Sequence, residues 1–110
     1  MSEQLEFQLA SWAAQLEQRK ADNDQLNKLR SVDHFFTFKD KKKADAAVAE
    51  LRSLAFEANV TKRGLFKSLV AASHVSDLQD QTVQDLLHVV VGIAEKHDGI
   101  YDGFGAYVEA

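Results

Sequence analysis

The chain has 110 residues, of which 45% are hydrophobic and 27% are charged, and it contains neither cysteine nor proline. These fractions are typical of one globular domain, and the lack of cysteine excludes disulfides, thiolate metal sites and cysteine nucleophiles. The formal net charge of −4 argues against a general attraction to nucleic acid.

The first predicted element is an amphipathic helix over residues 3–20. Its apolar residues recur at helical spacing: Leu5, Leu9, Trp12, Ala13 and Leu16. The polar cluster at residues 21–24 (ADND) predicts the end of this helix and the start of a connector to Ser31.

Residues 32–39 (VDHFFTFK) are dense in β-forming residues, which predicts a strand whose even-numbered residues face the core. Asp40 is predicted to cap a following helix that extends to about Phe56. The apolar residues of that helix also recur at helical spacing: Ala44, Ala47, Val48, Leu51, Leu54 and Ala55.

Two further strands are predicted near residues 58–62 and over residues 65–75. A hairpin turn at residues 62–64 (KRG) joins them, with Gly64 expected at a positive φ. The longer strand is apolar at both parities, which predicts a central strand that is covered, at least in part, on both faces.

Residues 76–79 (SDLQ) match a capping box, so a helix is predicted to begin there, and Gly99 is expected just past its end. The last predicted strand covers residues 101–108. In a regular strand Tyr101, Gly103, Gly105 and Tyr107 share one face, and Phe104 lies on the other.

The order α-β-α-β-β-α-β contains two β-α-β units joined by a hairpin. We therefore predict a single α+β domain over residues 1–110: a ferredoxin-like split βαβ sandwich (βαββαβ) at 31–110, with an extra N-terminal helix and connector at 1–30. Two helices cover one sheet face, and the first helix is free to cover part of the other. Of the two interpretations of that second face, we favour the one in which Trp12 and Leu9 fill a notch at Gly103 and Gly105.

The most specific motif is residues 94–98 (AEKHD) followed by residues 101–107 (YDGFGAY). With the weaker segments 24–36 and 51–60, it resembles the regulator of ribonuclease E activity B (RraB-like) family over about residues 21–109. Ala55 departs from the family pattern, which has a glycine where this helix turns into a strand. The resemblance implies a ferredoxin-like fold and a non-catalytic protein that binds an endoribonuclease of the ribonuclease E type and inhibits it.

Charge along the chain suggests how such binding would occur. Residues 76–110 carry one basic and seven acidic residues, whereas residues 39–67 carry eight basic and four acidic ones. We expect Asp77, Asp80 and Asp85, on the second sheet-packed helix, to dock on basic nuclease segments and to occlude them. In the alternative interpretation of the second sheet face, the candidate contact residues there are Phe35, Tyr101 and Tyr107.

Four lysines are candidate anion contacts: Lys39, Lys41, Lys42 and Lys43. Cations in the first turn of a helix oppose its dipole, and a bound anion would relieve that cost, although a solvated helix start is the favoured interpretation. The alternative function is a single-stranded RNA-binding module that uses these lysines and the second sheet face. The match of residues 103–105 (GFG) to the aromatic motif of RNA-recognition modules is poor, because Asp102 stands where a basic residue belongs, so direct nucleic-acid binding is disfavoured.

His34 and His74 meet if the first and third strands are neighbours. This leaves open a small enzyme or metal protein, although hydrogen-bonded packing residues are the favoured interpretation. No catalytic, phosphate-binding or metal-binding motif is present, so we expect no enzyme activity, cofactor or metal. No apolar run approaches the roughly 18 residues of a membrane span and the acidic start MSEQLEFQ is unlike a signal peptide, so we expect a cytoplasmic protein without a membrane partner.

Overall fold

The computed structural model describes residues 2–110. In chain order these residues form α1 (Glu3–Ala21), β1 (Arg30–Phe38), α2 (Lys41–Ser53), β2 (Glu57–Arg63), β3 (Ser68–Ser76), α3 (Asp80–Lys96) and β4 (Gly99–Gly105). The strands form one sheet in the order β2-β3-β1-β4, and all neighbouring strands are antiparallel. This order confirms the predicted α+β, ferredoxin-like arrangement.

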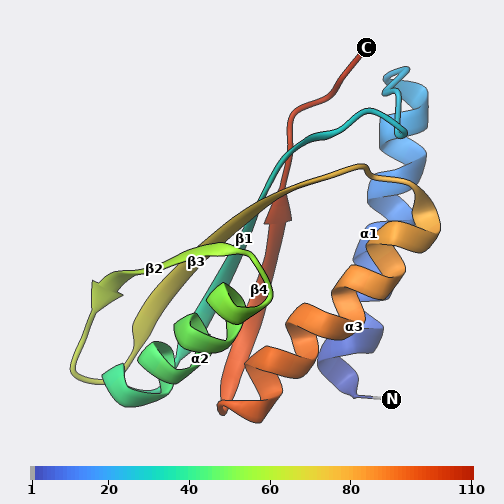
Figure 1. Cartoon of the computed structure of the whole chain (residues 1–110). Coiled ribbons are helices and arrows are strands. Elements are labelled where there is room, and N and C mark those ends of the chain that lie inside the picture. Colours follow the sequence, from blue (N-terminus) through green and yellow to red (C-terminus); the bar gives the residue numbers. More distant parts are fainter. Residues whose placement is uncertain (1) are drawn as a thin grey trace.

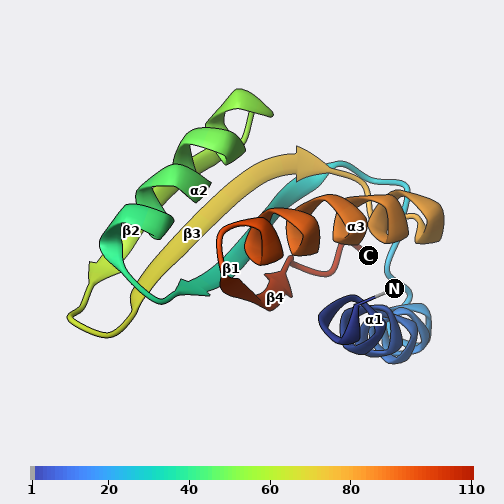
Figure 2. The same ribbon diagram turned by 90° about the horizontal axis from the view of Figure 1, so that it is seen from below.

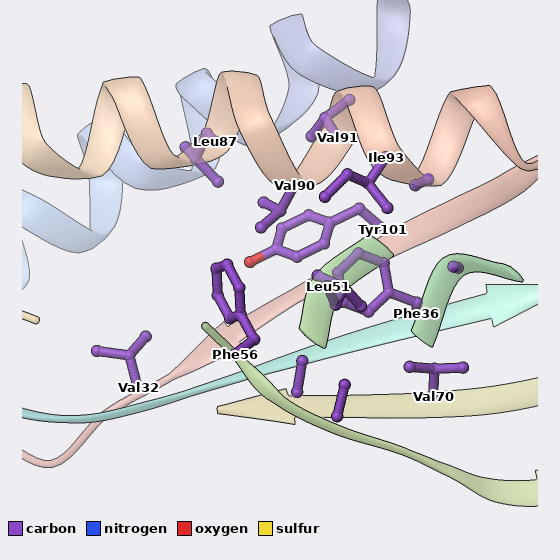
Figure 3. Close-up of a cluster of buried hydrophobic side chains, with 14 of the residues drawn as sticks. Val32, Phe36, Leu51, Phe56, Val70, Leu87, Val90, Val91, Ile93 and Tyr101 are labelled. Carbon is purple, nitrogen blue, oxygen red and sulfur yellow. The ribbon is translucent and has the colours of Figure 1, made fainter. Parts of the chain in front are cut away.

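Helices α2 and α3 pack on one face of the sheet (Figure 2). The even-numbered residues of β1 are buried there, as predicted: Val32, His34, Phe36 and Phe38. Figure 3 shows apolar side chains of α3 packed over Phe36 and Tyr101. We call the opposite face of the sheet, which contains Phe35, the open face.

Helix α1 forms where it was predicted but packs elsewhere. It lies beside α3, next to β4, and not over the open face (Figures 1 and 2). Trp12 is only 2% exposed; its ring centroid is 5.9 Å from that of Phe104, and its Nε1 donates to Asp80 Oδ1 at 2.9 Å. The favoured prediction that Trp12 fills the notch on the open face is therefore wrong, because α3 provides both an apolar surface and a hydrogen-bond acceptor for the indole.

Both edge strands of the sheet have backbone groups that are bonded to side chains. Tyr101 N–H in β4 donates to Gln4 Oε1 at 2.9 Å, and Gln8 Nε2 donates to the Tyr101 carbonyl at 3.1 Å. At the other edge, Arg52 Nε donates to the Ala58 carbonyl in β2 at 3.0 Å. These side chains act where a neighbouring strand would otherwise bond.

The hairpin between β2 and β3 differs from its prediction. Strand β3 begins at Ser68, so Leu65 and Phe66 lie in an exposed loop rather than in a strand. Gly64 does not have a positive φ. A Cβ there would instead collide with the Lys67 carbonyl, so this four-residue loop uses the glycine for close approach.

The ends of both sheet-packed helices also differ from their predictions. Helix α2 ends at Ser53, because Ala55 has the left-handed φ of 69°, at the position where the family pattern has a glycine. Helix α3 begins at Asp80 and not at the predicted capping box. After α3 the left-handed residue is Asp98, at φ 57°, while Gly99 begins β4 at a point where a Cβ would collide with the Phe38 ring.

Candidate functional site

A β-bulge in β4 decides which of its side chains face the core. Phe35 pairs with Gly103 but Phe36 pairs with Tyr101, so Asp102 is an extra residue, and Gly103 has a φ of 121°. An extra residue reverses the alternation of faces. Tyr101 is therefore 2% exposed in the core, and the prediction that placed it on the open face is wrong.

The buried Tyr101 ends a hydrogen-bonded chain with the two predicted histidines. Its Oη lies 2.7 Å from His34 Nδ1, and His34 Nε2 lies 3.0 Å from His74 Nε2. If Tyr101 donates to Nδ1, then His34 Nε2 carries the proton that is donated to His74. The predicted meeting of His34 and His74 is confirmed, and the Phe56 ring packs against both imidazoles.

The hydrogen-bonded side chains of Tyr101, His34 and His74 are all held in their neutral forms. Burial, and secondarily the neighbouring His74, lowers the pKa of His34 to about 3, and burial also lowers the pKa of His74. Burial raises the pKa of Tyr101 above its ordinary value. Side chains that stay neutral around pH 7 are poor acid–base catalysts there. Residues 2–110 also contain no cluster of three or more histidine, aspartate or glutamate side chains that could hold a metal ion.

The open face carries both polar and aliphatic side chains, with the aromatic ring of Phe35 near its centre. Three rows of side chains cross it from β2 to β4: Glu57, Ser73, Asp33 and Gly105, then Asn59, Ala71, Phe35 and Gly103, then Lys62, Leu69, Thr37 and Ile100. Phe35 is 48% exposed, and two shallow hollows share Asp33 as a lining residue. The three carboxylates of Asp33, Glu57 and Asp102 outnumber the one ammonium of Lys62 in these rows, so the face favours a cationic partner over a phosphate backbone.

The acidic residues predicted to dock on a partner lie at and before the start of α3. Asp80 and Asp85 are exposed on the helix, whereas Asp77 precedes it and accepts from Gln79 N–H at 2.9 Å. The placement of Asp77 on the helix is therefore wrong. Hydrogen bonds from Gln84 and then from Trp12 lower the pKa of Asp80.

The predicted lysine cluster is partly neutralised within the chain. Helix α2 begins at Lys41 with Asp40 as its cap, as predicted, and Lys43 Nζ lies 2.7 Å from Asp98 Oδ2. Lys39, Lys41 and Lys42 are exposed. Three of the four predicted lysines therefore point their charge at solvent.

A buried ionic cluster surrounds Asp24, and no sequence pattern described above predicts it. Arg19 Nη1 and Arg30 Nη1 each lie 2.7 Å from its carboxylate, and Glu109 N–H donates to it at 3.1 Å. Burial raises the pKa of Asp24, but the hydrogen bonds from Arg30, Arg19 and Glu109 together hold it below its usual value. Arg30 also donates to the Tyr107 carbonyl at 2.9 Å, so the cluster fixes the backbone beyond β4.

The signal for this cluster was present in the sequence. Two arginines flank Asp24 at five and six residues, on the last turn of α1 and at the start of β1. The polar cluster at residues 21–24 predicts the end of a helix but no ionic partners, because a turn aspartate has many local roles.

Comparison with known proteins gives a family match. The model of the family described as RraB, regulator of ribonuclease activity B, matches residues 13–106, a span that contains all four strands and both sheet-packed helices. No curated protein matches the chain. Within residues 2–110 no helix is both long and apolar enough to cross a membrane.

Proposed function

The chain belongs to the regulator of ribonuclease activity B family, and on this basis we propose that it is a non-catalytic protein that binds an endoribonuclease of the ribonuclease E type and inhibits it. The family match carries this proposal. We propose the cytoplasm as its place of action, because that is where such an enzyme meets its RNA substrates.

The proposed mechanism is occlusion of basic nuclease segments. Asp85 presents an exposed carboxylate on α3, Asp80 is exposed beside α1, where its Oδ1 accepts from Trp12, and Asp77 lies just before them. Basic segments of a nuclease attract RNA phosphates, so a carboxylate surface competes for the same groups. Binding of this kind weakens as salt is added.

The test is a reconstituted cleavage assay. A purified endoribonuclease of the ribonuclease E type cleaves a fluorogenic RNA oligonucleotide in the presence of increasing amounts of this protein. We expect a dose-dependent loss of rate that becomes smaller at high salt, and no cleavage by this protein alone. An unchanged rate at a large molar excess, together with no nuclease binding by surface plasmon resonance, would contradict the proposal.

The same assay separates inhibition through the enzyme from sequestration of the substrate. If this protein bound RNA directly, excess RNA would restore the rate, and the isolated protein would shift the fluorescence anisotropy of the oligonucleotide. We expect neither effect, because Asp33, Glu57 and Asp102 oppose phosphate on the open face.

A further inference from the structure

We propose that the open face carries a slot for an arginine side chain of a partner protein, formed by Phe35, Asp33 and Tyr107 above the β4 glycines. The occupant is an extended, arginine-rich protein segment. As a contact with the nuclease this inference rests on the proposed function, whereas the slot itself follows from the arrangement of the residues.

The carboxylate and the first aromatic ring lie on one strand and one face. Asp33 and Phe35 are two residues apart on β1, so their Cα atoms are separated by roughly 7 Å and their side chains project in the same direction. Both are exposed. Within residues 2–110 Asp33 forms no ion pair, so its carboxylate is available to an external cation.

The β4 side of these two residues is empty space. Gly105 lies opposite Asp33, and Gly103 lies opposite Phe35. Apart from the adjoining residues in the chain, no atom of residues 2–110 lies within 4 Å of a Cβ built on either glycine. The two glycines therefore leave a notch beside the ring and the carboxylate, and helix α1 does not fill it.

A second aromatic residue, Tyr107, lines a neighbouring hollow, and Asp33 is shared by that hollow and the one that Phe35 lines. Tyr107 lines a hollow together with Asp33 and Gly105, and it is 88% exposed. Its carbonyl is held by Arg30, so the backbone that carries the ring is anchored by the Asp24 cluster. The backbone of Tyr107 is therefore fixed, although its ring lies in solvent.

This combination favours arginine over other ligands. A guanidinium is planar, bonds a carboxylate through two parallel N–H groups and stacks on aromatic rings, whereas a lysine ammonium is a compact, strongly hydrated charge. Glu57 lies in the same cross-strand row as Asp33 and adds a second negative charge. A second arginine of an extended segment that lies along this row would bind the Glu57 carboxylate.

The test is a nuclear magnetic resonance titration of the ¹⁵N-labelled protein with an unstructured peptide of Gly-Ser-Arg repeats, beside a Gly-Ser-Lys peptide of equal charge. We expect the arginine peptide to shift the amide signals of Phe35, Gly103 and Gly105 and to bind at least threefold more tightly than the lysine peptide. Asp33→Asn and Phe35→Ala should each weaken arginine-peptide binding at least fivefold. Both positions are exposed, so these variants should fold.

The matched control is Glu95→Gln, which removes one exposed carboxylate on the outer side of α3. Its affinity for the arginine peptide should stay within twofold of the wild type. The slot is refuted if the shifts map to α3, if both peptides bind equally, or if all three variants weaken binding alike. It is also refuted if a single-stranded oligonucleotide shifts the same amides, which would make the open face an RNA surface.

The cleavage assay then separates the two proposals. Wild-type protein that inhibits the nuclease while Asp33→Asn and Phe35→Ala inhibit equally well would refute the slot as the nuclease contact and leave the proposed function standing. Wild-type protein that binds the arginine peptide in the slot but neither binds nor inhibits the nuclease would refute the proposed function and support the slot. Loss of inhibition in both variants, with Glu95→Gln unaffected, supports both proposals.

Discussion

The buried imidazole of His34 should make the protein less stable as the pH falls below 6.5. Burial, together with His74, lowers its pKa to about 3 in the folded state, from 6.5 as the ordinary value. Between these two values the unfolded chain binds a proton that the folded chain does not, so acidification favours unfolding. His74, whose pKa is also lowered by burial, acts in the same direction.

The size of the effect follows from the separation of the two pKa values. Each pH unit within the window removes about 1.4 kcal/mol, so lowering the pH from 8 to 5 removes about 2 kcal/mol through His34 alone. That is a large share of the 5–15 kcal/mol typical of a domain of this size. Stopping at pH 5 keeps the contribution of carboxylate protonation small, since unfolded carboxyl groups titrate near 4.

Urea unfolding at pH 8, 7, 6 and 5 measures this loss, with the single, buried Trp12 as the fluorescent probe. His34→Gln should lower the stability at pH 8 but should remove most of the decline between pH 8 and pH 5. His88→Gln, at an exposed position on α3, should retain the wild-type decline. A wild-type loss under 0.5 kcal/mol, or an undiminished decline in His34→Gln, would refute the reasoning.

Three further substitutions test other parts of the structure by chemical or thermal unfolding. Asp24→Asn should lower the free energy of unfolding by about 3–5 kcal/mol, because it leaves two buried arginines without their carboxylate. The exposed control Asp22→Asn should lower it by less than about 1 kcal/mol. Similar losses for the two variants would contradict the buried cluster. Ala55→Gly should stabilise the protein by about 1 kcal/mol through its left-handed φ, and a loss of stability would count against that conformation. Ser68→Ala should be neutral or stabilising by about 1 kcal/mol, because the Ser68 hydroxyl is buried without a hydrogen-bond partner in residues 2–110, and a clear destabilisation would reveal a partner.

The element order and the core face of β1 could be predicted from the sequence, because periodicity and β propensity are local properties that agree with the final packing. Which side chains of β4 face the core could not be predicted. Alternation assigns Tyr101 to the open face, but the bulge at Asp102 reverses it, and the only local mark of that bulge is Gly103. A glycine in a strand is compatible with a bulge, a bend or a close approach, so the sequence alone does not choose.

The packing position of α1 could not be predicted from the sequence either. The stripe on α1 shows that the helix must bury one side, but it does not show against what, and the hydrogen bond from Trp12 to Asp80 joins residues 68 positions apart. The candidate open-face site shares this limit. Phe35 was predicted from strand parity, whereas its availability depends on where α1 packs.

The side chains bonded to the sheet edges determine how a partner can approach. Gln4 and Gln8 occupy backbone groups of β4, and Arg52 occupies a carbonyl of β2, so an incoming chain that added itself as a fifth strand would first have to displace them. A partner is thereby directed to approach face-on, across the strands and through its side chains, rather than edge-on through its backbone. Recognition would then depend on the partner's residue types and spacing, and it would leave the hydrogen-exchange protection of the edge strands unchanged.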